Sequence, residues 1–385
     1  MLRFAAVVLS AAMSGITVLA VAEPPQVLID REACINSTSA ARFEAAITAC
    51  TRLVEALARG EIAGPEGAAV YVARGNLRAA HGEIDLAIAD YDRAILLDSN
   101  RPVTYFNRAG AFAASGEMDR AMADYDHVIA LDPMDADAYV GRARLAFAAH
   151  DYNRALVDYD RAAAINPRNA DALVGRGDVM FVRRDFDDAI IAYSEAIGID
   201  SMSGGGFLGR GRAYYRKKNF AAAALDYDAA IRLSPDDLEA LAEGGDAHEH
   251  ASHYDRAAEA YSRVIAIDPS NAKAWNNRCW DRALLGQLEA ALADCTESLR
   301  LVPDDPATLD SRGLIHLKLG RFAQAIADYD AALLRNPREP GSLYGRGLAR
   351  LRSRDDVDGG RADLAAAKAL DPSVAASFAS YGLSE

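Results

Sequence analysis

The chain has 385 residues, of which 51% are hydrophobic, and its formal net charge at pH 7 is −14. Proteins that bind nucleic acids are usually basic because phosphate contacts dominate their affinity, so this acidic balance argues against nucleic acid and against an anionic membrane surface as partners. A chain of this length would ordinarily form two or three domains, but its internal repeat indicates one elongated array stabilised by contacts between neighbours.

Residues 1–22 have the features of a secretory signal peptide. Arg3 supplies a short positive region, residues 4–21 are apolar and uncharged, and Ala20 and Ala22 form a small-x-small pattern before Glu23. We predict cleavage after Ala22, which leaves a net charge of −15 and no stretch apolar enough to span a membrane. The alternative is an uncleaved membrane anchor. A cleaved chain would be periplasmic or secreted, and the sequence does not distinguish the two.

From residue 68 onward the chain has a 34-residue period. The unit is well seen in residues 306–339, where Leu309 stands at position 4, Gly313 at position 8 and Gly320 at the expected turn. A proline recurs near the end of the unit, at Pro133, Pro167, Pro235, Pro269, Pro303 and Pro337. A fixed period of this length is typical of stacked helix hairpins, in which the proline ends the second helix.

Three further positions of the unit are nearly constant. Position 4 is bulky: Tyr71, Tyr105, Tyr139, Leu173, Phe207, Leu241, Trp275, Leu309 and Leu343. Position 20 is alanine: Ala87, Ala121, Ala155, Ala189, Ala223, Ala257, Ala291 and Ala325. Position 24 is aromatic, with one exception: Tyr91, Tyr125, Tyr159, Tyr193, Tyr227, Tyr261, Cys295 and Tyr329. In these positions the chain resembles the tetratricopeptide repeat (TPR) family. The resemblance implies an all-α fold, the TPR α-α superhelix, which is a right-handed solenoid of helix hairpins.

The repeat divides the chain into four segments. After the signal peptide, residues 23–67 form an N-terminal segment in which we expect extended chain at 23–31 and a degenerate capping repeat at 32–60. Nine TPR repeats occupy residues 68–373, and residues 374–385 form a C-terminal capping segment. The nine repeats begin at Ala68, Pro102, Ala136, Ala170, Gly204, Leu238, Ala272, Pro306 and Pro340. End repeats of such arrays are atypical because they cap the stack.

The four cysteines fall into two pairs with the same spacing. Cys34 and Cys50 form one pair and Cys279 and Cys295 the other, and each pair occupies positions 8 and 24 of a repeat. These positions face each other within a hairpin, and both have changed to cysteine together, twice. We predict a structural disulfide in each pair, since an exported protein can keep disulfides. Two pairs of buried thiols are the alternative. The spacing matches neither a redox motif nor a zinc site.

An arginine at position 7 and an aspartate at position 23 recur through most of the repeats. The 238–271 repeat lacks both, which indicates that the two residues pair within or between neighbouring hairpins. A bidentate arginine–carboxylate pair would hold the first helix against the second. Because the pattern follows the repeat and not one place in it, we interpret it as structural.

Residues 246–253 contain the one histidine cluster, with His248, His250 and His253 beside Glu249. A metal site would need two or three of these ligands to converge, and the alternative is a solvated turn. Otherwise we find no nucleophile elbow, no phosphate-binding glycine loop and no H-E-x-x-H motif. The sequence therefore predicts no enzyme activity, no cofactor and no metal.

In the TPR family the first helix of each hairpin lines a concave groove with positions 2, 5, 6, 9, 12 and 13. The resemblance therefore implies a peptide-binding groove, in which position 5 supplies an apolar stripe and position 12 an aromatic patch. The predicted groove residues are Val72, Asn76, Phe106, Asn107, Val140, Arg144, Phe147, Val174, Phe181, Leu208, Arg212 and Tyr215. Aromatic anchors in a concave surface suit the binding of a peptide or helix. The alternative is that position 5 packs against the adjoining helix.

One known mode of recognition in this family, the clamp for a terminal carboxylate, is incomplete here. Asn76, Asn107 and Arg144 match the clamp, but its two lysines are replaced by Val72 and Val140. We therefore expect a scaffold or adaptor that binds a protein or peptide in its groove, in envelope assembly or secretion. The alternatives are a self-assembling structural protein and a metal-handling protein that uses residues 246–253. The partner and the oligomeric state do not follow from the sequence.

Overall fold

The computed structural model describes residues 25–35 and 43–385, and all of its regular secondary structure there is helical. The predicted signal peptide lies outside the described residues. The chain divides into two compact units, one ending at His150 and the other beginning at Asp151. None of the described helices is long and apolar enough to cross a membrane.

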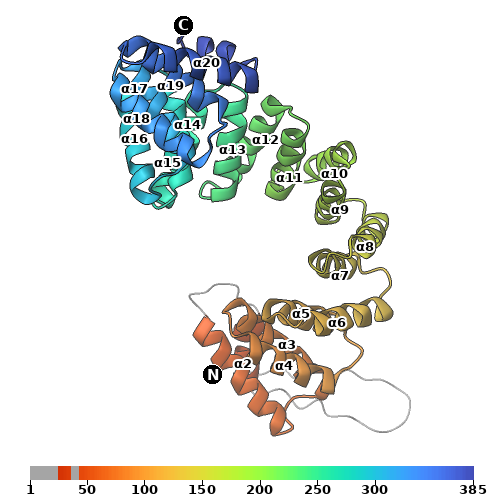
Figure 1. The fold of residues 1–385 in the computed structure, drawn as a ribbon. Helices are drawn as coiled ribbons and strands as arrows, with labels where there is room; N and C mark the ends of the chain where they lie inside the picture. The colour runs from red at the N-terminus through yellow and green to blue at the C-terminus, as the bar shows by residue number, and fades with distance from the viewer. Residues whose placement is uncertain (1–24, 36–42) are drawn as a thin grey trace, which may run out of the picture. The chain divides into compact units, whose positions relative to one another are not determined.

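Helix hairpins follow one another from α3 to α20 (Figure 1). The first helices of the hairpins are α3 (Gly64–Ala80), α5 (Pro102–Ser115), α7 (Ala136–Ala148), α9 (Ala170–Arg183), α11 (Gly204–Arg216), α13 (Leu238–His250), α15 (Ala272–Leu284), α17 (Pro306–Lys318) and α19 (Pro340–Ser353). The second helices are α4 (Ile84–Leu97), α6 (Met118–Leu131), α8 (Tyr152–Ile165), α10 (Phe186–Ile199), α12 (Phe220–Leu233), α14 (Tyr254–Ile267), α16 (Leu288–Leu301), α18 (Phe322–Arg335) and α20 (Val357–Leu370). The predicted all-α fold class, the TPR solenoid, is thereby confirmed.

The turn between the two helices of each hairpin has a left-handed backbone. Glycine occupies it in four hairpins, with φ between 71° and 84°: Gly82, Gly116, Gly286 and Gly320. In the other five the same position keeps a positive φ with a side chain attached: His150, Arg184, Lys218, Ser252 and Arg354. Glycine adopts this conformation without a steric penalty, whereas a residue with a side chain pays a cost in this conformation.

Paired arginine and aspartate side chains join the two helices within a hairpin. Arg278 Nε and an Nη atom donate to the two carboxylate oxygens of Asp294, at 2.9 and 2.8 Å. The same bidentate pair recurs as Arg74–Asp90, Arg108–Asp124, Arg210–Asp226, Arg312–Asp328 and Arg346–Asp363. The aspartates are buried, and each carboxylate is met by a fork of two donors. The predicted structural pairing is therefore confirmed for these six hairpins.

Glycine at position 8 makes room for the tyrosine at position 24. A Cβ atom on Gly177 would come within 2.6 Å of the Tyr193 ring, and one on Gly209, at position 6 of the next repeat, within 2.4 Å. The buried ring is thus held between two consecutive first helices. In α15 and α16 the same two positions are Cys279 and Cys295, which form a disulfide with an S–S distance of 2.03 Å.

An additional hairpin precedes the repeats, and it differs from the expected extended chain. Residues 25–31 belong to α1 (Pro25–Ile35), which pairs with α2 (Phe43–Ala58) through a disulfide between Cys34 and Cys50. Asp30 accepts two hydrogen bonds from Arg52, at 3.0 and 2.7 Å. The expectation of extended chain was wrong because proline suits the first turn of a helix, where its missing N–H costs nothing. Both predicted disulfides are present in the structure.

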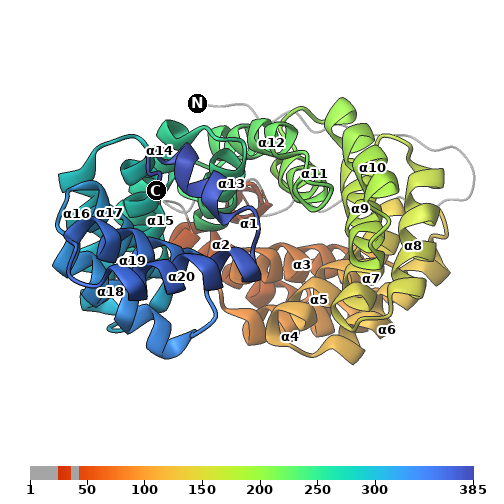
Figure 2. The same ribbon diagram turned by 45° about the horizontal axis from the view of Figure 1, so that its top comes forward.

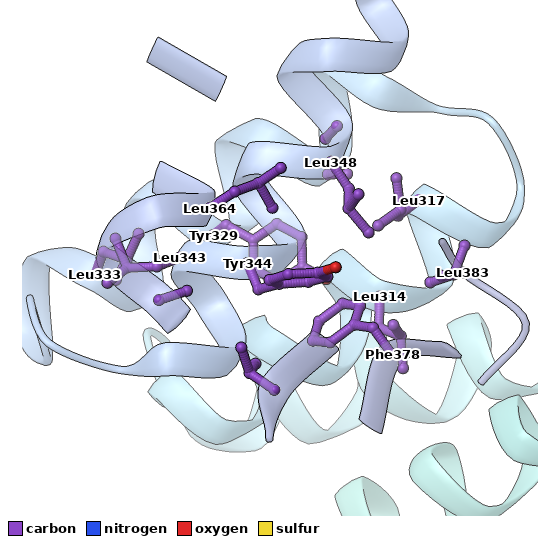
Figure 3. Close-up of a cluster of buried hydrophobic side chains, with 14 residues drawn as sticks. Leu314, Leu317, Tyr329, Leu333, Leu343, Tyr344, Leu348, Leu364, Phe378 and Leu383 are labelled. Atoms are coloured by element: carbon purple, nitrogen blue, oxygen red, sulfur yellow. The ribbon is translucent and has the colours of Figure 1, made fainter. Parts of the chain in front are cut away.

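The last helix, α21 (Val374–Ser380), packs on α19 and α20. Its Phe378 and the following Leu383 lie beside Tyr344, Leu314 and Leu317 (Figure 3). Tyr344 is almost fully buried, and its ring centroid is 4.8 Å from that of Phe378. The segment therefore covers apolar side chains of α17 and α19, two first helices that lie side by side (Figure 2).

Candidate functional site

The unit that begins at Asp151 contains a pocket of about 500 Å³ on its first helices. We call it the aromatic pocket; it is lined by Phe181, Arg212, Tyr215, Arg216, Tyr227, Glu239, Glu243 and Asp246. Three of these residues were predicted for the groove, namely Phe181, Arg212 and Tyr215. They come from α9 and α11, which contact each other directly. Because both helices are the first of their hairpins, the pocket faces the side on which the TPR groove was expected.

Two aromatic rings of the aromatic pocket are fixed by their neighbours. The Phe181 ring centroid is 5.5 Å from that of Phe186, and the Tyr215 ring meets Phe220 edge-on at 5.2 Å. His250 stacks on Tyr215 at 5.6 Å and also meets Phe220 edge-on at 4.7 Å. Phe181 and Tyr215 remain partly exposed. Rings that are held in place but still accessible lose little conformational entropy when a ligand covers them.

The charges of the aromatic pocket are arranged around Arg212. Its Nε donates to both carboxylate oxygens of Glu243, at 3.1 and 2.8 Å, and its guanidinium also forms an ion pair with Glu239. Burial by itself would lower the pKa of Arg212, but the two carboxylates outweigh it and raise that pKa, so the guanidinium is always charged. The pocket thus combines apolar rings with a positioned ion network, an arrangement that can hold the side chains and the backbone of a bound segment.

Two more predicted residues of this unit lie closer to the core. Val174 packs in the cluster around Tyr193, and Leu208 contacts the clusters around Tyr227 and Leu241. Both side chains are partly buried. They support the helices that carry the pocket, as the packing alternative for position 5 expects.

The other predicted groove residues belong to the unit that ends at His150. Val72 and Val140 are buried, with exposed fractions of 8% and 4%, so their side chains pack in the core and contribute little surface. Phe106 is partly buried and meets Tyr125 edge-on. In α7, Arg144 is exposed and Phe147 is partly buried.

The two asparagines that match the carboxylate clamp are bonded to each other. Asn107 Nδ2 donates to Asn76 Oδ1 at 2.8 Å, and the Tyr91 hydroxyl donates to the same oxygen. Asn76 Oδ1 therefore already accepts two hydrogen bonds. The polar atoms of the pair that these bonds leave for a ligand are Asn76 Nδ2 and Asn107 Oδ1.

The histidine cluster is engaged in protein contacts. His248 is buried, and its Nε2 lies 3.0 Å from Asp228 Oδ1, while His250 stacks on Tyr215. The His253 ring centroid is 5.7 Å from that of His248. Among the residues that the structure describes, no three His, Cys, Asp or Glu side chains converge on a place that could hold a metal ion.

The acidic wall of the aromatic pocket was not among the groove residues predicted from the sequence. Glu239, Glu243 and Asp246 stand at positions 2, 6 and 9 of the 238–271 repeat, which are groove positions in the TPR family. The signal is therefore present in the sequence, but it lies outside the apolar stripe of position 5 and the aromatic patch of position 12 on which the groove prediction rests. The three acidic residues are recognised as a cluster in one repeat only when positions 2, 6 and 9 are considered together.

The family model for the tetratricopeptide repeat matches residues 72–136, 140–201, 208–272, 243–306 and 311–375. These matches cover well over half of the chain, which therefore belongs to the tetratricopeptide repeat family. TPR arrays present extended concave surfaces to other proteins and generally serve as scaffolds for protein–protein interaction.

Several solved structures are similar to this chain. YrrB, described as a TPR protein with an unusual peptide-binding site, is 24% identical, with 49% of this chain and 97% of YrrB covered and a TM-score of 0.45. PilF of Pseudomonas aeruginosa is 19% identical, with 54% of this chain and 94% of PilF covered and a TM-score of 0.47. The C-terminal part of a TPR protein from Cytophaga hutchinsonii is 16% identical, with 62% of this chain and 98% of that structure covered and a TM-score of 0.49. No curated protein matches the chain.

Proposed function

We propose that the chain is an exported scaffold that binds a protein segment in the groove formed by the first helices of its hairpins. The observation that carries this proposal is the aromatic pocket, which brings Phe181, Tyr215 and Arg212 together. Partly exposed rings in a concave surface give most of the binding energy in peptide recognition, and surrounding charges fix the register. The scaffold would act as an adaptor in envelope assembly or secretion.

Export is supported by the two disulfides and by the sequence of residues 1–22. Cys34–Cys50 and Cys279–Cys295 each close a hairpin, and the described chain has no free cysteine. Disulfides of this kind persist in oxidising compartments and are rare in the cytosol. Periplasmic and secreted locations are both compatible with them.

Site-specific photocrosslinking in the native host tests the groove. A benzophenone amino acid at Phe181 replaces one aromatic side chain with another and probes the aromatic pocket directly. The control position is Arg161, an exposed residue of α8, the second helix of the preceding hairpin. We expect a discrete crosslinked partner at position 181 and none at position 161.

A second experiment uses the partner captured at position 181, identified by mass spectrometry. Replacing Phe181 and Tyr215 with serine should weaken its binding by about tenfold or more, because each lost aromatic anchor costs on the order of 1–2 kcal/mol. Equal crosslinking at both positions, or unchanged affinity of the serine variant, would show that the aromatic pocket is not the binding site.

A further inference from the structure

A second pocket lies on the first helices further along the same unit. Its volume is about 440 Å³, and it is formed by residues of α13, α15, α17, α18 and α19. We call it the acidic pocket, after Glu249, Asp310 and Glu339, which line it together with Asn276, Asn277 and Trp280. Helix α13 contributes to both pockets, since its Asp246 lines the aromatic pocket and its Glu249 the acidic pocket.

The acidic pocket has no positive charge of its own. Among the described residues, no Lys, Arg or His lines it. Lys273 is a nearby cation; its Nζ lies 3.4 Å from Asp246 Oδ2, and its side chain is 73% exposed. Asp310 accepts a hydrogen bond from the Ser342 hydroxyl. The carboxylates of Glu249 and Asp310 therefore line a partly enclosed space with hydrogen-bond acceptors and little compensating charge.

Two side chains of α15 have buried acceptor oxygens without a hydrogen-bond partner. Asn276 Oδ1, in the wall of the acidic pocket, is buried and unpaired. Asp281 is 0% exposed, and neither of its carboxylate oxygens has a partner. Burial, and then the neighbouring charges of Glu249 in the wall and of Asp246, raise the pKa of Asp281. Buried polar atoms are nearly always paired, so the unpaired Asn276 oxygen in the pocket wall points to a donor supplied from outside the chain.

The acidic residues interrupt patterns that the other repeats keep. Asp281 stands at position 10 of its repeat, where every other repeat has an apolar residue: Leu77, Ala111, Leu145, Val179, Ala213, Ala247, Ile315 and Ala349. At position 5, the apolar series from Val72 to Ala242 changes to Asn276 and Asp310. These substitutions occur in neighbouring repeats, and two of them, Asn276 and Asp310, line the acidic pocket. The packing of a TPR hairpin does not require them, since other repeats fold without them.

Burial raises the pKa of Glu249 to about 7 and that of Asp310 to about 6. Asp246 adds to the shift of Glu249 and Glu339 to that of Asp310, whereas Lys273 opposes the shift of Glu249. The other titratable groups that interact with Glu249 are Asp281, Tyr215, Tyr261 and Tyr381. A cation placed among these carboxylates would favour their ionised forms.

We propose that the acidic pocket binds a cationic nitrogen group, the guanidinium or ammonium of an arginine or lysine side chain in a bound peptide. Such a group supplies the donor that Asn276 lacks, and it compensates the charge of the carboxylates in the wall. The indole ring of Trp280 lies in the same wall and adds a face for a cation–π contact. This inference rests on the geometry of the acidic pocket and does not depend on the aromatic pocket.

Trp280 makes the test direct, because the chain has only two tryptophans. The Trp275→Phe substitution leaves Trp280 as the single tryptophan, so the tryptophan fluorescence reports on Trp280 alone. Phenylalanine is chosen because Phe207 stands at the equivalent position of another repeat. The full-length protein is titrated with the peptide acetyl-Gly-Arg-Gly-amide at pH 8. The matched control peptide carries citrulline, which has the same shape as arginine and no charge. We expect a saturable change with the arginine peptide and binding at least about tenfold weaker with the citrulline peptide.

Charge-removing variants locate the binding site. Glu249→Gln and Asp310→Asn keep the side-chain shape, and each should weaken binding of the arginine peptide by about fivefold or more. Glu289→Gln removes the same charge from the exposed first turn of α16 and should leave the affinity unchanged. Affinity should also fall by roughly tenfold between pH 8 and pH 5.5, because the carboxylates take up protons in this range and no longer attract the cation.

Two results would overturn the proposal. Equal responses to the arginine and citrulline peptides, or equal effects of Glu249→Gln and Glu289→Gln, would show that the acidic pocket does not select a cation. Binding of free spermidine at least as tight as that of the arginine peptide would overturn the peptide as the source of the cation. Neither result bears on the crosslinking at Phe181, so this inference and the proposed function can fail separately.

Discussion

Asp281 is the buried residue least expected in a helical repeat. It is fully enclosed between helices and has no hydrogen-bond partner, and its burial, together with Glu249 and Asp246, raises its pKa to about 9. A carboxyl group in such a place is protonated at neutral pH, because burying an unpaired charge costs far more than binding a proton. The folded state therefore holds a proton there that the unfolded chain releases.

This proton predicts an unusual dependence of stability on pH. The folded-state pKa of Asp281 is above the unfolded value, so between about pH 4 and pH 9 the folded state binds more protons and stability falls as pH rises. Glu249 and Asp310 act in the same direction. Asp281→Ala, which restores a residue common at this position, should stabilise the protein at pH 8 by on the order of a few kcal/mol and much less at pH 5.

Thermal unfolding followed by circular dichroism at pH 5 and pH 8 measures this difference. Asp236→Ala, in the exposed loop before α13, serves as the control for the loss of a carboxylate and should change the melting temperature little at either pH. An Asp281→Ala protein that is no more stable than the wild type at pH 8 would mean that the carboxyl group has a partner in solution.

Single residues were the hardest to predict from the sequence. The cysteine pairs were found because two constant positions changed together. Asp281 was missed because position 10 is not among the marked positions of the TPR pattern. Its importance depends on complete burial and on Glu249, which belongs to the preceding repeat and is distant from it along the chain. Proximity of this kind arises only when the hairpins stack.

At the scale of the helix hairpin the sequence was far more informative. The 34-residue period, Ala at position 20 and Tyr at position 24 locate both helices, because each of these residues packs against the partner helix. The N-terminal boundary was less accurate. Helix α3 begins at Gly64, before the expected start of the first repeat at Ala68, and α1 covers residues expected to be extended. End repeats have a neighbouring repeat on one side only. Fewer of their positions must pack against another repeat, so their sequences keep less of the pattern by which inner repeats are recognised.

The turn between two helices offers a prediction at this scale. Lys218 holds a φ of 60° between α11 and α12, where four other hairpins have glycine. A left-handed conformation costs a residue with a side chain about 1–2 kcal/mol, and glycine's greater freedom in the unfolded chain cancels part of the gain. Lys218→Gly should therefore stabilise the protein by about 0.5–1 kcal/mol, as measured by the midpoint of urea unfolding.

The matched control is Gly286→Ala, which makes the opposite change at the same position of the hairpin formed by α15 and α16. Gly286 has a φ of 75°, and a Cβ there would meet no other atom within 4 Å. Any loss of stability in this variant therefore comes from the backbone alone. If both Lys218→Gly and Gly286→Ala lowered the urea midpoint, the prediction would be wrong. The Lys218 side chain would then stabilise the folded state by more than the left-handed backbone destabilises it.

Over the whole molecule, each hairpin is stabilised by its neighbours. Within each compact unit, contacts join successive helices. The disulfides and the bidentate arginine–aspartate pairs stay within single hairpins, whereas Arg108–Asp92, Arg142–Asp126 and Arg346–Asp330 join consecutive hairpins. The sequence predicted this arrangement because it repeats. It did not predict which groove positions form pockets, since those depend on how far each first helix is covered by the next. The C-terminal segment illustrates the point, for it covers apolar residues of α17 and α19.

Removal of residues 374–385 tests how far a local loss spreads. The deletion exposes the partners of Val374, Phe378 and Leu383, three buried side chains worth about 1.5–3 kcal/mol each. In an array of nearest-neighbour contacts the effect should decline with distance along the stack. Hydrogen exchange measured by mass spectrometry should then rise tenfold or more in α17, α19 and α20, and stay unchanged in α9 to α12.

The same truncated protein also tests the self-assembly alternative. The newly exposed apolar surface lies on α17 and α19, so a protein that stacks end to end through this segment would change its elution volume in size-exclusion chromatography. A monomer before and after the deletion would count against self-assembly. A uniform rise in hydrogen exchange from α9 to α20 would instead show that these hairpins unfold as one cooperative block. With nearest-neighbour coupling alone, the effect of removing a terminal segment would decrease from one hairpin to the next.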